Sequence, residues 1–69
     1  MPETTTGVRA ARNRAGLRQA DLAAAVGVSR QTIISLERGD YSPSVYLALR
    51  IARALESTVE ELFPLSEEE

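Results

Sequence analysis

QADLAAAVGVSRQTIISLER, residues Gln19–Arg38, is the stretch of sequence that decides the fold. Its first half carries small and apolar side chains at helical spacing and ends at Gly27, which adopts the positive φ of a sharp turn without steric cost. The helical spacing resumes after Ser29, whose hydroxyl can cap a new helix. The stretch therefore predicts two short helices that cross at a tight turn.

Packing explains the apolar side chains of this stretch. Ala23 is small enough to let the two helices approach closely, and Val28 fills the turn between them. The inner face of the second helix is expected to bury its apolar residues, Ile33 and Leu36, against Leu22 and Val26 of the first. Its outer face is left with Arg30, Gln31, Ile34 and Ser35.

Turn and capping residues divide the rest of the chain into three more helices. Thr5 or Thr6 caps a first helix that runs to about Ala15, and Gly16 ends it. That helix presents Val8, Ala11 and Ala15 on one side. The predicted second helix is Gln19–Val26, with Asp21 near its positive end, and the third runs from Ser29 to Gly39.

The sequence pattern of the second half of the chain predicts the fourth and fifth helices. Ser42-Pro43-Ser44 opens a fourth helix, which carries Leu47, Ile51, Ala54 and Leu55 at helical spacing as far as Glu56. Ser57-Thr58-Val59-Glu60 indicates a capping box for a fifth, and Pro64 stops it. Strand signals are nearly absent, so the fold class is all-α with five helices. A chain of 69 residues supports one domain, with an ordered core of about 5–65 and an acidic tail, 66–69.

Composition excludes most catalytic chemistry. The chain has no Cys and no His, so thiolate metal sites and the commonest acid-base side chain are both missing. The acidic clusters, Glu60-Glu61 and Glu67 to Glu69, are typical of solvated termini. We therefore expect no enzyme, no metal, no cofactor and, without a second domain to form a pocket, no small-molecule effector. No apolar run is long enough for a membrane span and the start lacks signal-peptide features, which predicts a cytoplasmic protein.

Charge is divided unevenly between the two halves. Residues 1–38 hold six Arg against three acidic residues, a net +3, whereas residues 39–69 hold two Arg against seven acidic residues, a net −5. The overall charge of −2 thus conceals a basic half suited to phosphate. All the cations are Arg, which suits bidentate contacts to phosphate or guanine, although a GC-rich genome would give the same bias.

Several motifs together resemble a known family. They are VRxxR (Val8 to Arg12), GLRQADLA (Gly16 to Ala23), VGVSRQTI (Val26 to Ile33), LERG (Leu36 to Gly39), YSPS (Tyr41 to Ser44), LALRIARAL (Leu47 to Leu55) and VEELF (Val59 to Phe63). With these motifs the chain resembles the Xre/Cro-type, lambda-repressor-like helix-turn-helix regulators over nearly its whole length, most closely short stand-alone members such as the cytolysin-repressor type. The resemblance implies a homodimeric repressor that binds double-stranded DNA and inserts its third helix into the major groove.

The resemblance also implies a set of DNA contacts. Arg30, Gln31 and Ser35 face base edges, and their chemistry agrees, because Arg pairs with guanine, Gln with adenine, and Ser is a permissive hydrogen-bonding group. Ile34 departs from the polar residue common at this position, and either touches a thymine methyl or packs within the chain. Gln19 contacts phosphate at the start of the second helix. The other phosphate candidates are Arg9, Ser29, Thr32, Arg38, Tyr41 and Ser42; Arg9 and Arg38 could equally be solvated.

Glu37 is an unexpected residue on a helix that faces phosphates, because a carboxylate there is repelled unless a neighbour neutralises it. The family resemblance supplies Arg12 as that neighbour. We interpret the two residues as a structural pair that ties the first helix to the third; the alternative is that Arg12 is a free phosphate ligand.

The dimer is expected to use the carboxyl-terminal part of the chain. Val59, Leu62 and Phe63 lie at one-turn spacing and Leu65 continues the apolar surface, although some of these side chains must fill the monomer core. Relatives also pair a short amino-terminal strand with residues after the last helix, but Pro2 and the acidic tail argue against it.

A second function remains open at this point, because one fold serves several roles. The alternative is a protein-interaction module, such as an antitoxin or an accessory regulator. The polar start of the third helix and the charge asymmetry favour DNA, since a protein-binding version would expose several apolar residues there.

Overall fold

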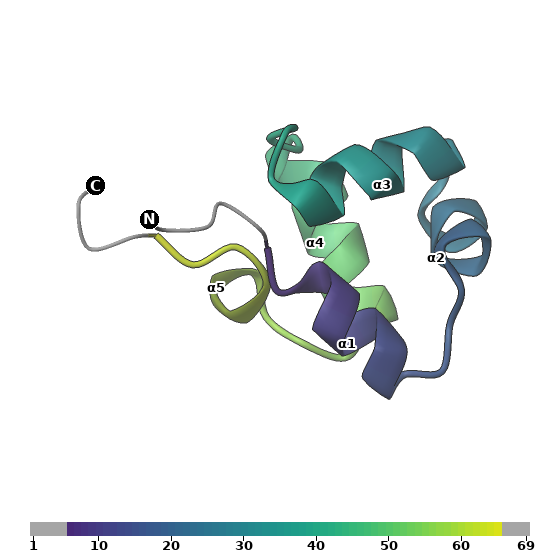
Figure 1. Cartoon of the computed structure of the whole chain (residues 1–69). Helices are drawn as coiled ribbons and strands as arrows, with labels where there is room; N and C mark the ends of the chain where they lie inside the picture. The colour runs from purple at the N-terminus through teal and green to yellow at the C-terminus, as the bar shows by residue number, and fades with distance from the viewer. Residues whose placement is uncertain (1–5, 66–69) are drawn as a thin grey trace.

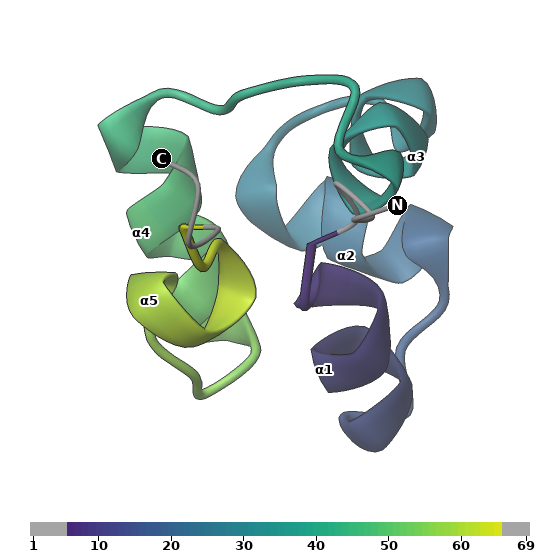
Figure 2. The same cartoon turned by 60° about the vertical axis from the view of Figure 1, so that its left-hand side comes forward.

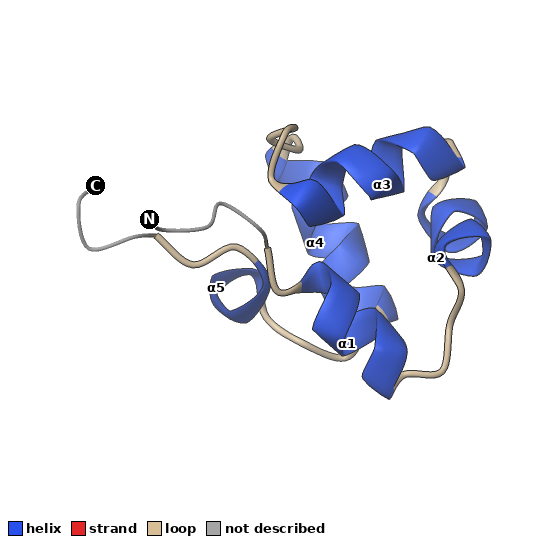
Figure 3. Ribbon diagram, viewed as in Figure 1, coloured by secondary structure: helices blue, strands red, loops and turns tan. Residues whose placement is uncertain are grey.

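The computed structural model describes residues 6–65. Within them the chain forms five α-helices and no strand, which confirms the predicted fold class (Figures 1 and 3). Thr5, Pro2 and the predicted acidic tail, 66–69, lie outside the described residues. The helices are α1 (Val8–Arg14), α2 (Gln19–Val26), α3 (Arg30–Arg38), α4 (Val45–Ala54) and α5 (Val59–Leu62).

The turn between α2 and α3 has the predicted geometry. Gly27 takes a left-handed conformation, φ 79°, and donates its N–H to the carbonyl of Ala23 at 2.9 Å. An L-amino acid with a side chain is disfavoured there, which explains the glycine. The turn brings Leu22 of α2 and Ile33 of α3 into one fully buried core, and Val28 packs against that core from the turn.

Local hydrogen bonds fix the ends of the next helices. The Ser29 hydroxyl accepts from the backbone N–H of Thr32 at 3.1 Å and starts α3, which ends at Gly39 with φ 82°. The Ser44 hydroxyl accepts from the N–H of Leu47 at 3.1 Å and starts α4. Each cap satisfies a donor that the first turn of a helix leaves free.

The predicted inward face of α1 is wrong at one position. Val8 and Ala11 are buried, but Ala15 is exposed because the helix ends at Arg14. Arg12 is buried instead, in a row with Val8 and Ala11.

The expected threonine cap of α1 is also displaced. The N-cap is Gly7, and Thr6 lies one residue earlier. The Thr6 hydroxyl accepts from the N–H of Val8 at 3.3 Å and donates to the carbonyl of Leu36 at 3.2 Å. It therefore ties the start of α1 to α3.

The N-cap of α5 lies one residue later than predicted, and the reciprocal bond of a capping box is not formed among the described residues. Thr58, not Ser57, is the N-cap, and its hydroxyl accepts from the N–H of Glu61 at 3.1 Å. Ser57 instead donates its hydroxyl to the Glu61 carboxylate at 2.8 Å. After α4 the chain turns at Glu56, which has a left-handed conformation with a φ of 53°. Two residues later, Thr58 has the extended backbone of an N-cap.

The two ends of the described chain meet. Figure 2 shows α4 and α5 on one side of the molecule and α1, α2 and α3 on the other. Gly7 joins the two sides, because its N–H donates to the carbonyl of Leu62 at 2.8 Å. A Cβ at Gly7 would lie 2.7 Å from the carbonyl oxygen of Glu61, so only glycine fits this approach. The buried core between the two sides is formed by Val8, Ala11, Leu22, Ala23, Val26, Ile33, Leu36, Leu47, Ile51, Ala52, Leu55 and Leu62.

Candidate nucleic-acid interface

The outer face of α3 carries polar side chains toward solvent. Arg30 and Gln31, in the first turn, are exposed, whereas Ile34 and Ser35 are half-buried. This placement follows from the helical period, because Ile33 and Leu36 take the buried side. Ser29 and Thr32 lie at the start of the same helix with their hydroxyl oxygens 3.0 Å apart.

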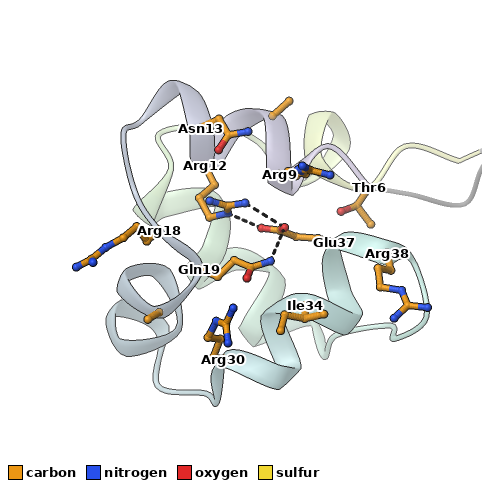
Figure 4. Close-up of a pocket in the computed structure, with 12 residues that line it drawn as sticks. Thr6, Arg9, Arg12, Asn13, Arg18, Gln19, Arg30, Ile34, Glu37 and Arg38 are labelled. Carbon is orange, nitrogen blue, oxygen red and sulfur yellow. Dashed lines mark hydrogen bonds and ion pairs between the residues drawn. The ribbon is translucent and has the colours of Figure 1, made fainter.

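An open hollow of about 1130 Å³ lies between α1, α2 and α3 (Figure 4). Its wall brings together five of the predicted DNA-contact residues, from all three helices. They are Arg9, Gln19, Arg30, Ile34 and Arg38.

The other predicted contacts lie outside the hollow. Four of them belong to the start and outer face of α3, and two belong to the loop that follows it. They are Ser29, Gln31, Thr32, Ser35, Tyr41 and Ser42.

Three of the five arginines in this wall form ion pairs, one of them the buried pair of Arg12 with Glu37. Nε of Arg18 lies 3.2 Å from Oδ2 of Asp21, and Nε of Arg38 lies 3.3 Å from Oδ2 of Asp40. Both pairs are exposed, so each leaves a weakly held cation at the surface. Within residues 6–65, no carboxylate pairs with Arg9 or Arg30.

Asp21 also shapes the start of α2. Its carboxylate accepts the backbone N–H of Arg18 at 3.0 Å and the side-chain Nε of the same residue at 3.2 Å. The backbone hydrogen bond, then the side-chain bond, holds the pKa of Asp21 below its ordinary value of 3.8.

A buried carboxylate forms the floor of this region. Glu37 is 6% exposed, and its Oε2 accepts from Nε of Arg12 at 2.6 Å while its Oε1 accepts from Nη2 of Arg12 at 3.2 Å. Nη1 of Arg12 donates to the carbonyl of Leu17 at 2.9 Å. A third donor, Nε2 of Gln19, reaches Glu37 Oε1 at 3.2 Å. The cluster thus connects α1, α2 and α3, and the guanidinium compensates the buried charge.

Sequence reasoning missed two features of this surface. Thr6 and Arg18 line the hollow, although they were not chosen as DNA contacts. Asp40 was also missed as the partner of Arg38; the signal was available, since the two residues flank the sharp turn at Gly39.

The predicted dimer residues differ in their availability. Leu62 is 1% exposed and fills the monomer core, so its assignment to a dimer surface is wrong for this conformation. Val59 and Phe63 are half-buried against the same core, and Leu65 is 83% exposed. Other large apolar side chains are exposed in residues 6–65 and were not predicted as part of the dimer surface. They are Val45, Tyr46 and Leu49 on the outer face of α4, and Tyr41 in the preceding loop.

Within 6–65, no three His, Cys, Asp or Glu side chains come together as a metal site. None of the helices there is long and apolar enough to cross a membrane.

Two crossing helices with a tight glycine turn, a polar outer face on the second and a basic hollow beside them define a helix-turn-helix DNA-binding protein. The chain belongs to the HTH_3 helix-turn-helix family, whose profile matches residues 8–62. This is a family of DNA-binding transcriptional regulators and not of enzymes.

Relatives and solved structures agree with this assignment. A Methanothermobacter thermautotrophicus protein, described as an uncharacterised HTH-type transcriptional regulator, is 55% identical over 62 residues, which cover 88% of this chain and 90% of the relative. The restriction-modification controller protein C.AhdI of Aeromonas hydrophila is 36% identical, with a TM-score of 0.73 over 81% of this chain and 85% of that one. The P22 c2 repressor, solved with a synthetic operator, is 30% identical, with a TM-score of 0.82 over 93% and 97%.

Proposed function

We propose that this chain is a sequence-specific repressor that reads a palindromic operator in double-stranded DNA with α3 in the major groove. The observation that carries the proposal is the position of the exposed side chains of Arg30 and Gln31 at the start of α3, beside the arginine-lined hollow. Free donors on a short helix suit base edges, and the basic hollow suits the sugar-phosphate backbone. The P22 c2 repressor, which was solved on an operator, supports the same role.

Base reading is assigned to the outer face of α3. Arg30 donates to O6 and N7 of guanine, Gln31 recognises adenine, and Ser35 makes a permissive hydrogen bond. Ile34 contacts a thymine methyl group. Its place in the wall of the hollow, and not among the apolar side chains that pack against the core, supports this role over internal packing.

Phosphate binding is assigned to the residues around that face. Gln19, the first residue of α2, combines a side-chain amide with the positive end of the helix. Arg9 and Arg38 supply charge from α1 and α3. Because Glu37 already compensates the charge of Arg12, we assign Arg12 a structural role. Hydroxyls at the helix start and in the loop after α3 complete the set: Ser29, Thr32, Tyr41 and Ser42.

A homodimer completes the proposed mechanism. One recognition helix covers only a few base pairs, whereas a two-fold dimer places two such helices about 34 Å apart, one turn of DNA. Leu65, with the exposed edges of Val59 and Phe63, is the surface we assign to the partner subunit. The protein acts in the cytoplasm as a single domain, without a cofactor or a small-molecule effector bound to this chain.

The dimer surface is tested by sedimentation at tens of micromolar. Leu65→Asp should give a folded monomer. Tyr46→Asp is the matched control, because it places the same charge on the exposed face of α4. A dimer lost in Tyr46→Asp and kept in Leu65→Asp would move the interface to α4. A wild-type monomer that binds its operator one copy at a time would contradict the dimer.

The function itself is tested by selecting bound duplexes from a random pool. Recovery of a palindrome with two half-sites about one helical turn apart supports the proposal. No enrichment over non-specific binding would contradict it and favour a protein-interaction module.

A further inference from the structure

Glu37 does more than balance the charge of Arg12. Its carboxylate receives three hydrogen bonds, two from Arg12 of α1 and one from the amide of Gln19 of α2, although Glu37 itself lies in α3. Gln19 is half-buried and lines the hollow. One carboxylate therefore contacts a side chain that we assign to the DNA surface.

The chemistry of the carboxylate determines how this amide is oriented. An ionised carboxylate only accepts hydrogen bonds, so the nitrogen end of the Gln19 amide must face Glu37. The amide oxygen is then turned away from Glu37, toward the part of the hollow where Arg30 lies (Figure 4). The amide nitrogen has a second N–H that Glu37 does not use, and this N–H is the donor that we assign to phosphate. The opposite orientation would set the amide oxygen against a negative oxygen.

We propose that Glu37 is a positioning residue for DNA binding, which holds the Gln19 carboxamide in one orientation before DNA arrives. The proposal rests on the function proposed above, in which Gln19 contacts phosphate. A long polar side chain that is free in solution must lose rotamer freedom when it binds. A side chain already fixed by Glu37 avoids that loss, so Gln19 should contribute more to affinity with Glu37 present than without it.

A purely structural role for Glu37 predicts something different. If Glu37 served only to join α1 to α3 through Arg12, its removal would lower stability, and any loss of DNA affinity would not depend on the residue at position 19. The two roles are separated by a double-mutant cycle, which measures whether the effects of two substitutions are coupled.

The cycle compares wild type, Glu37→Gln, Gln19→Ala and the double variant. Each is titrated with a mixed-sequence duplex of about 20 base pairs, at a temperature where circular dichroism shows all four folded. Glu37→Gln should weaken binding about three- to tenfold in the wild-type background and less than about twofold in the Gln19→Ala background. An equal loss in both backgrounds, or no loss in either, would overturn the proposal.

A second measurement needs neither DNA nor a substitution that threatens folding. The chain has two glutamines, Gln19 and Gln31, and the exposed Gln31 serves as an internal control. In free wild-type protein, the heteronuclear NOE of the Gln19 side-chain amide should match that of the helical backbone, while Gln31 should be mobile. A Gln19 amide as mobile as Gln31 would overturn the proposal. A rigid Gln19 in a protein that binds no duplex would instead contradict the proposed function alone.

Discussion

Nε of Arg12 lies 2.6 Å from Oε2 of Glu37, and both side chains are almost completely buried. The contact joins the first helix to the helix that carries the predicted base-reading residues. A buried pair of this kind gives little net stability compared with apolar packing, but the loss of one partner strands the charge of the other. The position of α3 therefore depends on its contact with α1 through this ion pair.

Arg12→Ala should lower the free energy of unfolding by about 3 kcal/mol or more, because it leaves the Glu37 carboxylate buried and uncompensated. Urea denaturation of the free protein measures the loss. Arg18→Ala is the matched control, since it removes the same group from an exposed pair with Asp21 and should change stability little. Equal effects of the two substitutions would show that the Arg12 pair is no more important than a surface contact.

Arg30→Ala and Gln31→Ala should each weaken binding to the selected operator by about 1 to 3 kcal/mol and relax the preference at particular base pairs. Gln19→Ala should weaken all duplexes to a similar extent, because phosphate contacts carry no sequence information. Binding selection repeated with each variant gives the comparison. Arg53→Ala, the same substitution on α4, should leave base preference intact. An unchanged preference in Arg30→Ala would place α3 outside the groove.

Asp40→Asn should strengthen binding to every duplex by about two- to fivefold at low salt, and less at high salt. The reason is that Asp40 holds Arg38 at 3.3 Å and adds a negative charge next to a cation assigned to phosphate. Glu60→Gln removes the same charge from α5 and is the control. If both substitutions raised affinity equally, net charge would explain the effect and the local pair would not.

Glu56→Gly should raise the free energy of unfolding by about 1 kcal/mol, because Glu56 has a φ of 53°, a conformation that glycine adopts more easily. Glu56→Ala removes the same charge and keeps the unfavourable backbone, so it should give no such gain. Thermal unfolding of the three proteins is the measurement. A gain in Glu56→Ala as large as that in Glu56→Gly would assign the effect to charge.

The ionisation of Asp21 should make the thermal stability of the protein depend on pH. The pKa of Asp21 in the folded chain lies below the ordinary value of 3.8, so the ionised carboxylate stabilises the fold above that value, and this contribution disappears as pH falls through the lower folded-state pKa. The melting temperature of wild type should exceed that of Asp21→Asn at about pH 6 and approach it at about pH 2.5. A difference that stays constant across this range would contradict the assignment.

The sequence was sufficient where local conformation decides the structure. The bounds of α2 and α3 follow from Gly27, Ser29 and Gly39, each of which has a conformational or capping preference that needs no tertiary contact. The core positions Leu22 and Ile33 follow from periodicity for the same reason.

The remaining features depend on contacts between elements distant in the sequence, and periodicity could not reveal them. The hydrogen bond from Gln19 to Glu37 joins two helices, and the depth of Leu62 depends on the approach of Gly7 to α5. The pattern Val59, Leu62 and Phe63 is equally compatible with a core and with a dimer surface. Only the packing of α5 distinguishes the two.

The position of Gly7 has a consequence for the order in which the chain folds. Its N–H is bonded to Leu62, and the neighbouring Thr6 N–H lies 3.4 Å from the carbonyl oxygen of Glu37, so residues 6 and 7 contact both the last helix and the end of α3. Neither contact can form before α3 and α5 are in place. A contact between residues far apart in the sequence closes a long loop, which is entropically unfavourable. Such contacts therefore often form late in folding. We therefore expect α2 and α3 to associate early and the start of α1 to close the structure as its final step.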